Sequence, residues 1–354
     1  MTHTKHPPLA RPKLGFYART EFALVGTVCA RIHELLERWA AALEEEVRVL
    51  ARPGAPGHFG NDNPYADRLL GAAYDLVLTN GNHFRAAKQI VFVDPAKAGS
   101  LERRREQLTD VALVVRCPGT EQIPDWLPNT VPTCLLAEVD QVALPIIRSA
   151  VRSAVPPVKA LLLAGGKSER MGEDKAGLVY RNGQSELGRL AAIVRSLGMQ
   201  PYVSLRDADS VPSYVPPDLP IIADRFQELG PHGAICSALI TDPDSAWLVL
   251  ACDLPLLERE DVAGLLSSRD PKQYATALRG ADRPFPEPLI AIYEPRAYRR
   301  LLEFLSLGYA CPRKMLINSE IAEVITEPRP LTNANTPEER AAVLERLTVS
   351  VTTP

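Results

Sequence analysis

A short, mostly apolar run, residues 158–163, leads directly into Ala164-Gly165-Gly166 and then into a segment rich in cations. Such a run beside a glycine pair is typical of a buried parallel strand whose carboxyl end opens into a loop. The glycines let backbone N–H groups approach an anion closely, because no Cβ blocks the way. Lys167, Arg170 and Lys175 follow, with three acids between them. The segment matches neither GxGxxG nor GxxxxGK(S/T). It predicts an α/β domain whose loop fits a nucleoside triphosphate; the simplest alternative is a strand-to-helix turn with a solvated charged face.

The overall composition limits the classes of function. With 40 basic and 43 acidic residues, the net charge is −3, whereas nucleic-acid-binding domains usually carry a strongly basic face. No apolar stretch reaches the length of about 18 residues that spans a bilayer, and residues 1–13 lack the apolar core of a secretion signal. The six cysteines form no CxxC pair, a pattern typical of reduced thiols. We therefore expect a cytoplasmic protein that binds neither nucleic acid nor membrane.

The length of 354 residues and the placement of the prolines predict two domains. Pro156-Pro157 stands between a helical stretch and the apolar run, so we place the boundary there, with domains 1–155 and 156–354. In the second domain, short apolar runs alternate with amphipathic stretches, which is typical of a mainly parallel sheet between helices. The expected strands are 158–163, 201–205, 220–222, 246–251 and 274–278, and the expected helices include 185–197 and 231–241. Ligands of such sheets bind at the carboxyl ends of the strands.

Two further segments place polar residues where that rule predicts a site. The run 246–251 ends in Cys252-Asp253-Leu254-Pro255, and an aspartate there is costly unless it caps a helix, pairs with a cation or binds a metal. Magnesium fits, because it takes one or two carboxylates together with phosphate oxygens and water. Near the C-terminus, Thr336-Pro337 followed by two acids predicts a helix start. A helix start does not explain the preceding Asn333 and Asn335.

Together these segments resemble the sugar-phosphate-type nucleotidyltransferases, and most closely the molybdenum cofactor guanylyltransferases. The resemblance rests on Gly165, Gly166, Ser168, Arg170, Met171, Gly172 and Lys175, on Cys-Asp-x-Pro around Asp253, and on Asn-x-Asn-Thr-Pro-Glu at 333–338. It implies a Rossmann-like nucleotidyltransferase domain with a mainly parallel sheet. The nucleotide-binding residues that it implies are Leu163, Ala164, Gly165, Gly166, Lys167, Lys175, Asp224 and Asp253. It further implies that Lys175, Arg170 and Asp253 are catalytic, that Asp253 and Asn335 hold Mg²⁺, and that Asn333 lies near the acceptor.

Two weaker segments bear on the substrate. Residues 229–235 resemble the segment that accompanies guanine use in this family, and Asp224 resembles its base- or ribose-side acid. A carboxylate can accept from the N–H groups of guanine, but each segment could equally be a loop and a helix cap. We expect His232 on a surface loop. Arg313 and Lys314 are candidates for binding the acceptor phosphate or a pterin; the alternative is a solvated helix start.

The implied reaction is attack by an acceptor phosphate on the α-phosphorus of GTP, with pyrophosphate leaving. Positioning and charge neutralisation supply most of the catalysis in such a transfer. The resemblance implies a molybdopterin-type acceptor, and an apo-molybdoenzyme or another protein of the cofactor pathway is a candidate partner. The alternatives are a CTP-dependent cytidylyltransferase acting on molybdopterin or on a sugar or polyol phosphate, and a chaperone that holds nucleotide or cofactor without catalysis.

The first domain also has an α/β pattern. Its expected strands are 13–17, 47–50, 75–78, 89–93, 111–115 and 133–136, with a helix from near residue 28 to 48. Residues 75–84 and 88–93 resemble part of the GTP-binding adaptor protein of molybdopterin guanine dinucleotide synthesis. No Gly-Lys-Ser/Thr occurs at 18–27, where a P-loop would stand. We therefore expect a smaller, degenerate P-loop-like α/β domain that docks a cofactor precursor or a target apoenzyme. The candidates for a residual site, or else for solvated loops, are Arg19, Asn80, Asn82, His83 and Lys88.

Overall fold

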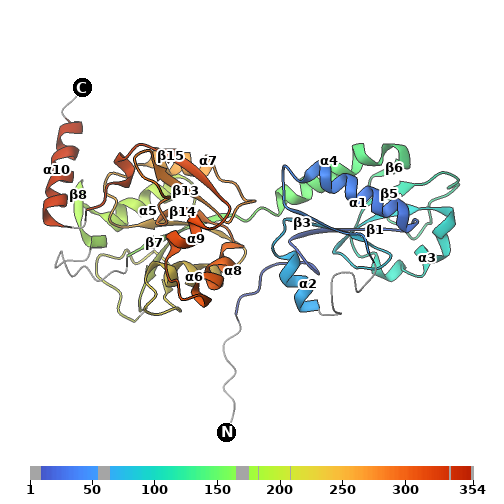
Figure 1. The fold of residues 1–354 in the computed structure, drawn as a ribbon, viewed down its shortest axis with the longest axis horizontal. Helices are drawn as coiled ribbons and strands as arrows, with labels where there is room; N and C mark the ends of the chain where they lie inside the picture. Colours follow the sequence, from blue (N-terminus) through green and yellow to red (C-terminus); the bar gives the residue numbers. More distant parts are fainter. Residues whose placement is uncertain are drawn as a thin grey trace, which may run out of the picture. The chain divides into compact units, whose positions relative to one another are not determined.

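The computed structural model describes residues 9–54, 64–164, 175–181, 183–207, 209–334 and 336–351. Contacts within the chain divide it into two compact units, one of Lys13–Val155 and one that contains Pro156–Pro354. We call them the N-terminal unit and the C-terminal unit and describe each by itself (Figure 1).

The C-terminal unit is built on a seven-stranded sheet with the order β11-β10-β7-β12-β14-β13-β15. The strands are β7 (Val158–Leu163), β10 (Pro201–Leu205), β11 (Ile221–Ala223), β12 (Ala246–Ala251), β13 (Ala275–Gly280), β14 (Ile290–Tyr293) and β15 (Ile321–Thr326). Every neighbouring pair is parallel except the two pairs that contain β14, which runs against β12 and β13. The expectation of a mainly parallel sheet is therefore confirmed.

Helices cover both faces of this sheet, because alternate side chains of its strands point to opposite sides. Leu162 of β7 packs with helices α5 (Glu186–Ser196) and α7 (Arg259–Ser267), whereas its neighbour Leu161 packs with α6 (Pro231–Thr241), α8 (Ala297–Ser306) and α9 (Pro312–Ile317). Figure 1 shows the same two layers of helices. A short hairpin, β8 (Val179–Arg181) with β9 (Gln184–Ser185), precedes α5, and α10 (Pro337–Val351) ends the unit.

The N-terminal unit has a six-stranded sheet in which every pair is parallel, with the order β2-β3-β1-β4-β5-β6. The strands are β1 (Thr20–Val25), β2 (Val49–Arg52), β3 (Leu76–Asn80), β4 (Lys88–Val93), β5 (Val111–Arg116) and β6 (Thr133–Leu135). Helices α1 (Cys29–Leu43) and α4 (Val139–Ser153) pack on one face, and α3 (Ala98–Glu102) contributes to the core on the other; α2 (Pro64–Gly71) lies between β2 and β3 in the chain. This unit is thus α/β, as expected.

The first strand of this unit lies elsewhere than predicted. Residues 13–17 are not a strand; β1 begins at Thr20 and contains Glu21, whose side chain is buried. The Glu21 carboxylate accepts hydrogen bonds from the backbone N–H groups of Phe16, Tyr17, Ala18 and Ala87 at 2.7–3.2 Å. A buried carboxylate is tolerated when it is hydrogen-bonded in this way. Most of 18–27 is therefore strand, and the connection from β1 to α1 consists of residues 26–28 alone.

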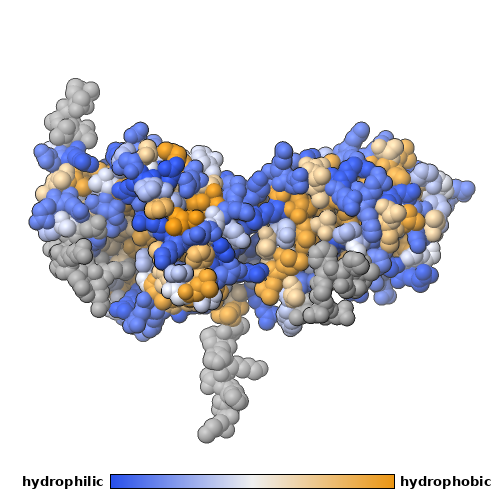
Figure 2. Space-filling view, viewed as in Figure 1, coloured by the Kyte–Doolittle hydropathy of each residue, from blue (hydrophilic) through white to orange (hydrophobic). Residues whose placement is uncertain are grey.

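In the described part of the chain, no helix is both long and apolar enough to cross a bilayer. On the face shown in Figure 2, hydrophilic residues surround smaller apolar areas, as expected when helices and strands turn their apolar faces inward.

Candidate active site

The carboxyl ends of β7 and β12 lie side by side and hold the start of the candidate site. The two strands are parallel and in register, with Ala251 opposite Leu163. β12 is buried along its whole length, and the chain then continues through Cys252 to Asp253. Leu163 and Ala164, where the glycine-rich segment begins, are therefore at the same edge of the sheet as Asp253, as the sequence predicts.

Lys175 and Asp253 are in contact at this edge. The lysine Nζ lies 3.4 Å from Asp253 Oδ2, and the two side chains are 25% and 20% exposed. Lys175 opens a 3₁₀ turn, Lys175–Gly177. The remaining predicted residues of the loop, Gly165, Gly166, Lys167 and Arg170, lie outside the described residues.

The other carboxylate oxygen of Asp253 is the atom that most favours a bound cation. Oδ1 is buried and has no hydrogen-bond partner within the described parts of the chain. Leaving a buried acceptor unsatisfied costs free energy, and hard divalent cations prefer such oxygen ligands. The helix-cap alternative for Asp253 is wrong, because α7 begins at Arg259 and its N-cap is Glu258. Asp253 therefore fits a divalent cation.

The Asn-x-Asn segment also reaches this edge of the sheet. The backbone N–H of Ala334 donates to the backbone oxygen of Asp253 at 3.1 Å, which places the neighbouring Asn333, itself exposed, beside the candidate site. Asn335 lies outside the described residues. The predicted helix start after it is confirmed: Thr336 and Glu339 exchange side-chain-to-backbone hydrogen bonds of 3.2 Å each, a capping box at the start of α10.

Asp224 follows β11 and organises the turn before α6. Its Oδ1 accepts from the Phe226 N–H at 3.0 Å and from the Ser237 hydroxyl at 3.1 Å. A Cβ on Gly233 would lie 2.2 Å from the Phe226 oxygen and 3.1 Å from Asp224 Oδ1, so this close packing requires glycine. Asp224 thus has a structural role, because it caps this turn. Its predicted contact with the nucleotide stays a prediction.

The expectation for His232 is wrong. Its side chain is fully buried rather than on a surface loop, because Pro231 is already the first residue of α6 and the helix turns His232 inward, toward the backbone of Leu301 on α8. Burial lowers the pKa of His232, which favours a neutral imidazole in the core.

The two predicted acceptor-binding cations are engaged with neighbouring side chains. Arg313 lies 3.1 Å from Glu287, and the Lys314 ammonium stands 4.0 Å from the centre of the Tyr309 ring. Glu287 also pairs with Arg283, which donates to the Leu331 oxygen at 2.9 Å. Arg283 and Glu287 therefore connect Arg313 to the chain just before Asn333, a link that the sequence analysis missed.

Two tyrosines beside the site were also missed. The Tyr214 hydroxyl lies 3.5 Å from the Ala164 oxygen, and its ring would be 2.9 Å from a Cβ on Gly177, so Tyr214 contacts both ends of the glycine-rich segment. Burial, together with the charge of Glu186, raises the pKa of Tyr180 to about 12. No local pattern marks either residue, because both reach the site through tertiary contacts.

In the N-terminal unit the candidate residues divide between two edges of the sheet. Asn80 ends β3, and Asn82 and His83 follow it, whereas Arg19 precedes β1 and Lys88 begins β4. Because all strands are parallel, Arg19 and Lys88 lie at the opposite edge, so the five candidates do not come together in one place. Lys88 pairs with Asp110 at 2.6 Å.

The position of a P-loop in this unit is filled by an internal ion pair. Thr27, in the short connection after β1, donates to Asp94 Oδ2 at 2.5 Å, and Arg31 of α1 lies 2.7 Å from the same oxygen. Burial opposes ionisation of Asp94, but hydrogen bonds from Thr27 and Ala96 and the charge of Arg31 outweigh it, so the pKa is lowered.

The C-terminal unit has parallel strands with polar residues gathered at their carboxyl ends, as nucleotide-binding α/β enzymes do, and comparison with known proteins shows a nucleotidyltransferase. The model of the MobA-like NTP transferase domain matches residues 160–322. Over 190 residues the chain is 30% identical to the molybdenum cofactor guanylyltransferase of Xanthomonas euvesicatoria pv. vesicatoria, covering 52% of this chain and 92% of that protein. The chain belongs to the molybdenum cofactor guanylyltransferase family.

A longer relative and a solved structure complete the comparison. The chain is 33% identical over 160 residues to the molybdenum cofactor biosynthesis bifunctional protein of Synechocystis sp., covering 45% of this chain and 46% of that protein. The chain thus spans about half the length of that relative. The crystal structure of molybdopterin-guanine dinucleotide biosynthesis protein A from Archaeoglobus fulgidus has a TM-score of 0.46 and 21% identity, covering 54% of this chain and 99% of that one.

Proposed function

We propose that the C-terminal unit transfers GMP from GTP to a phosphorylated, molybdopterin-type acceptor and releases pyrophosphate. The observation that carries this proposal is the Lys175–Asp253 contact, in which one carboxylate oxygen stays buried and unpartnered within the described residues. The choice of GTP and of the acceptor is supported by the guanylyltransferases among the relatives.

In this mechanism the chain positions two phosphates and neutralises their charge. Lys175 approaches the α-phosphate from its place beside Asp253, where an ammonium stabilises the charge that develops during transfer. The glycine-rich segment, with Lys167 and Arg170, binds the triphosphate, and Asp224 lies on the base side. Asn333, Arg313 and Lys314 bind the acceptor. When bound by Asp253 and Asn335, a divalent cation, Mg²⁺ in this proposal, supplies positive charge at the phosphate oxygens.

The test is pyrophosphate release from each of the four nucleoside triphosphates with Mg²⁺ and molybdopterin. We expect turnover with GTP, and we expect Asp253→Asn to abolish it. The matched control is Asp218→Asn, which changes a carboxylate of the same unit that pairs with Arg195 at the surface. Preference for CTP would overturn the guanylyl assignment, and nucleotide binding without turnover would favour a chaperone.

We further propose that the enzyme works in the cytoplasm and that the N-terminal unit is an adaptor that does not hydrolyse nucleotide. Six cysteines, none of which forms a disulfide, support a reducing compartment. The Thr27–Arg31–Asp94 cluster supports the loss of hydrolysis, because it occupies the edge where a P-loop would bind phosphate. This edge would instead serve to dock a cofactor precursor or an apo-molybdoenzyme. GTP hydrolysis that persists in an Asp253→Asn chain would contradict this proposal.

A further inference from the structure

Five consecutive backbone oxygens after β12 each accept a hydrogen bond from another part of the chain. We call residues 253–257 the aspartate loop, because Asp253 begins it. Ala334 N–H donates to the Asp253 oxygen at 3.1 Å, and three arginines donate to the other four oxygens. The arginine contacts are Arg189 to Leu254 at 3.2 Å and to Leu257 at 2.6 Å, Arg181 to Pro255 at 2.8 Å, and Arg329 to Leu256.

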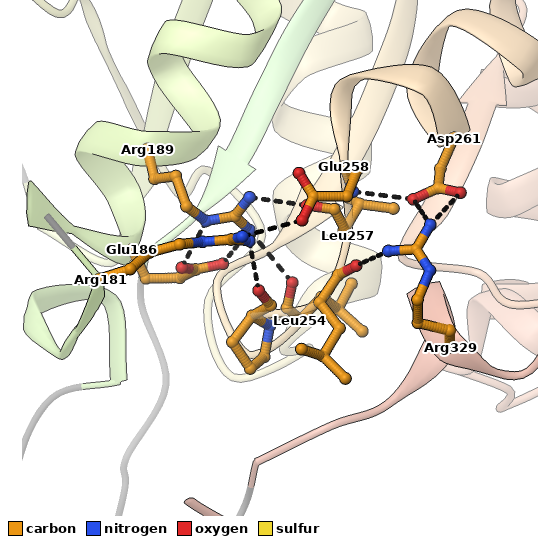
Figure 3. A network of polar contacts seen from close by, with 10 residues as sticks. Arg181, Glu186, Arg189, Leu254, Leu257, Glu258, Asp261 and Arg329 are labelled. Atoms are coloured by element: carbon orange, nitrogen blue, oxygen red, sulfur yellow. Dashed lines mark hydrogen bonds and ion pairs between the residues drawn. The ribbon is translucent and has the colours of Figure 1, made fainter. Parts of the chain in front are cut away.

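These arginines come from three separate elements, so they hold the loop from several directions (Figure 3). Arg181 lies on β8, Arg189 on α5, and Arg329 opens the 3₁₀ turn Arg329–Leu331. In a loop between a strand and a helix, backbone oxygens ordinarily accept hydrogen bonds from water, because loops run over the surface. Here side chains take the place of that water, which restricts the conformations that the loop can adopt.

Each of the three arginines is also paired with its own carboxylate. Arg189 contacts Glu186 at 2.5 and 2.8 Å, Arg181 contacts Glu258 at 2.8 Å, and Arg329 contacts both oxygens of Asp261 at 2.9 Å. A guanidinium has five N–H donors in a rigid plane, so it can hold a carboxylate and a backbone oxygen at once.

The pairing has an electrostatic consequence for Asp253. An unpaired arginine near the loop would repel a divalent cation, whereas an arginine with its carboxylate adds no net charge. The three pairs therefore fix the backbone of the loop without adding net charge near Asp253. The charges that balance the Asp253 carboxylate then come from Lys175 and from the ligand.

We propose that Arg181, Arg189 and Arg329 are positioning residues that hold the Asp253 carboxylate in the orientation that binds the divalent cation. This inference rests on the proposed function and extends it to residues that touch neither nucleotide nor metal. Partners that orient a metal ligand typically contribute about 10- to 100-fold to metal affinity. The same loss is expected when the arginines are removed.

The main test compares two arginines of the same unit whose side chains are exposed to a similar small extent. Arg189→Met removes contacts to the aspartate loop, whereas the matched control Arg269→Met breaks a similar pair with Glu294 that holds the Pro156 oxygen instead. The arginine and its acid are 10% and 1% exposed in the first pair and 12% and 1% in the second. Mn²⁺ binding in the presence of GTP is measured on the full chain by electron paramagnetic resonance. We expect Arg189→Met to weaken it about tenfold or more, and Arg269→Met to leave it within about threefold of the wild-type value.

A second variant covers the case in which Arg189→Met does not fold. Arg329 is 48% exposed, so Arg329→Met should fold and still weaken Mn²⁺ binding and accelerate hydrogen exchange of peptides that contain the aspartate loop. At saturating metal, its KM for GTP should stay unchanged. Wild-type Mn²⁺ affinity in Arg329→Met overturns the inference but leaves the proposed function intact. Absence of Mn²⁺ binding by the wild-type chain with GTP overturns both.

Discussion

Replacing Asp253 by Ala should abolish nucleotidyl transfer while leaving the metal-free protein at least as stable as before. The reason is the unequal surroundings of the two carboxylate oxygens. Oδ2 lies 3.4 Å from the Lys175 ammonium, but Oδ1 is buried with no hydrogen-bond partner in the described regions. A carboxylate whose main role is to fold the chain would have both oxygens satisfied.

The expected change in the free energy of unfolding follows from two opposing contributions. Removing a buried, unsatisfied acceptor relieves a cost of about 1–3 kcal/mol. Losing a partly exposed ion pair at a long separation removes about 0–1 kcal/mol of stabilisation. The sum is a free energy of unfolding between about the wild-type value and ~3 kcal/mol above it.

Asp242 offers a matched control on the same sheet. It precedes β12, at the edge opposite Asp253, and its carboxylate contacts Lys159 at 2.5 Å, the Ser245 hydroxyl at 2.7 Å and the Asp244 N–H at 3.0 Å. Asp242→Ala leaves these groups without their acceptor, so it should lower the free energy of unfolding by about 1–3 kcal/mol. It should leave the rate constant for transfer unchanged.

The assay combines guanidinium unfolding in the presence of a chelator with pyrophosphate release from GTP and acceptor. Hydrogen exchange of peptides from β7 and β12 reports the C-terminal unit separately from the other unit. A decrease of more than about 2 kcal/mol in the metal-free free energy of unfolding of Asp253→Ala would identify Asp253 as a structural residue, because a satisfied buried group typically stabilises a protein by such an amount. The reasoning would then fail. Retained transfer activity would refute it equally.

Three further changes test other parts of the molecule. Lys175→Met should lower kcat for pyrophosphate release about 10²- to 10³-fold, and a kcat within threefold of wild type would argue against its contact with the α-phosphate. Gly233→Ala places a Cβ 2.2 Å from a backbone oxygen and should lower the free energy of unfolding, measured by thermal denaturation, by about 1–3 kcal/mol. Gly264→Ala on α7 places its Cβ in open space and should not destabilise the protein. Because the folded pKa of Asp94 is lowered, its stabilisation is present above about pH 4 and is lost as the pH falls through the folded value. Asp94→Asn should therefore flatten the acid dependence of urea unfolding in the N-terminal unit, and an unchanged dependence would contradict the Asp94 assignment.

Three neighbouring strands of the C-terminal unit, β10, β7 and β12, could be predicted to the residue, because interior strands buried on both faces are mostly apolar. The predicted ranges of β7, β10 and β12 and of α6 agree with the structure. β14 and β15 were missed. β14 has only four residues, and β15 is a sheet-edge strand without a continuous buried run.

Residues whose environment depends on distant contacts could not be predicted from local pattern. β1 of the N-terminal unit was misplaced because Glu21 breaks its apolar run, and only the folded chain shows that four backbone N–H groups satisfy this carboxylate. Arg181, Arg189 and Arg329 belong to the same category, since their acceptors lie 65 to 74 residues away in the sequence. From the sequence alone, each of them is indistinguishable from an ordinary charged residue at the surface.

The two units treat a carboxylate at the end of a parallel strand in opposite ways, and this difference separates a binding site from a structural anchor. Asp94, after β4, has both oxygens hydrogen-bonded, by the Ala96 N–H on one side and by Thr27 and Arg31 on the other. A cation arriving there would have to displace partners that already compensate the charge. Asp253, after β12, has one oxygen buried without such a partner in the described residues, so a cation that binds it relieves a cost that the folded chain already bears. The same residue type in the same topological position is therefore closed to a cation in one unit and open to one in the other, and the difference lies in the neighbours that each sheet edge supplies.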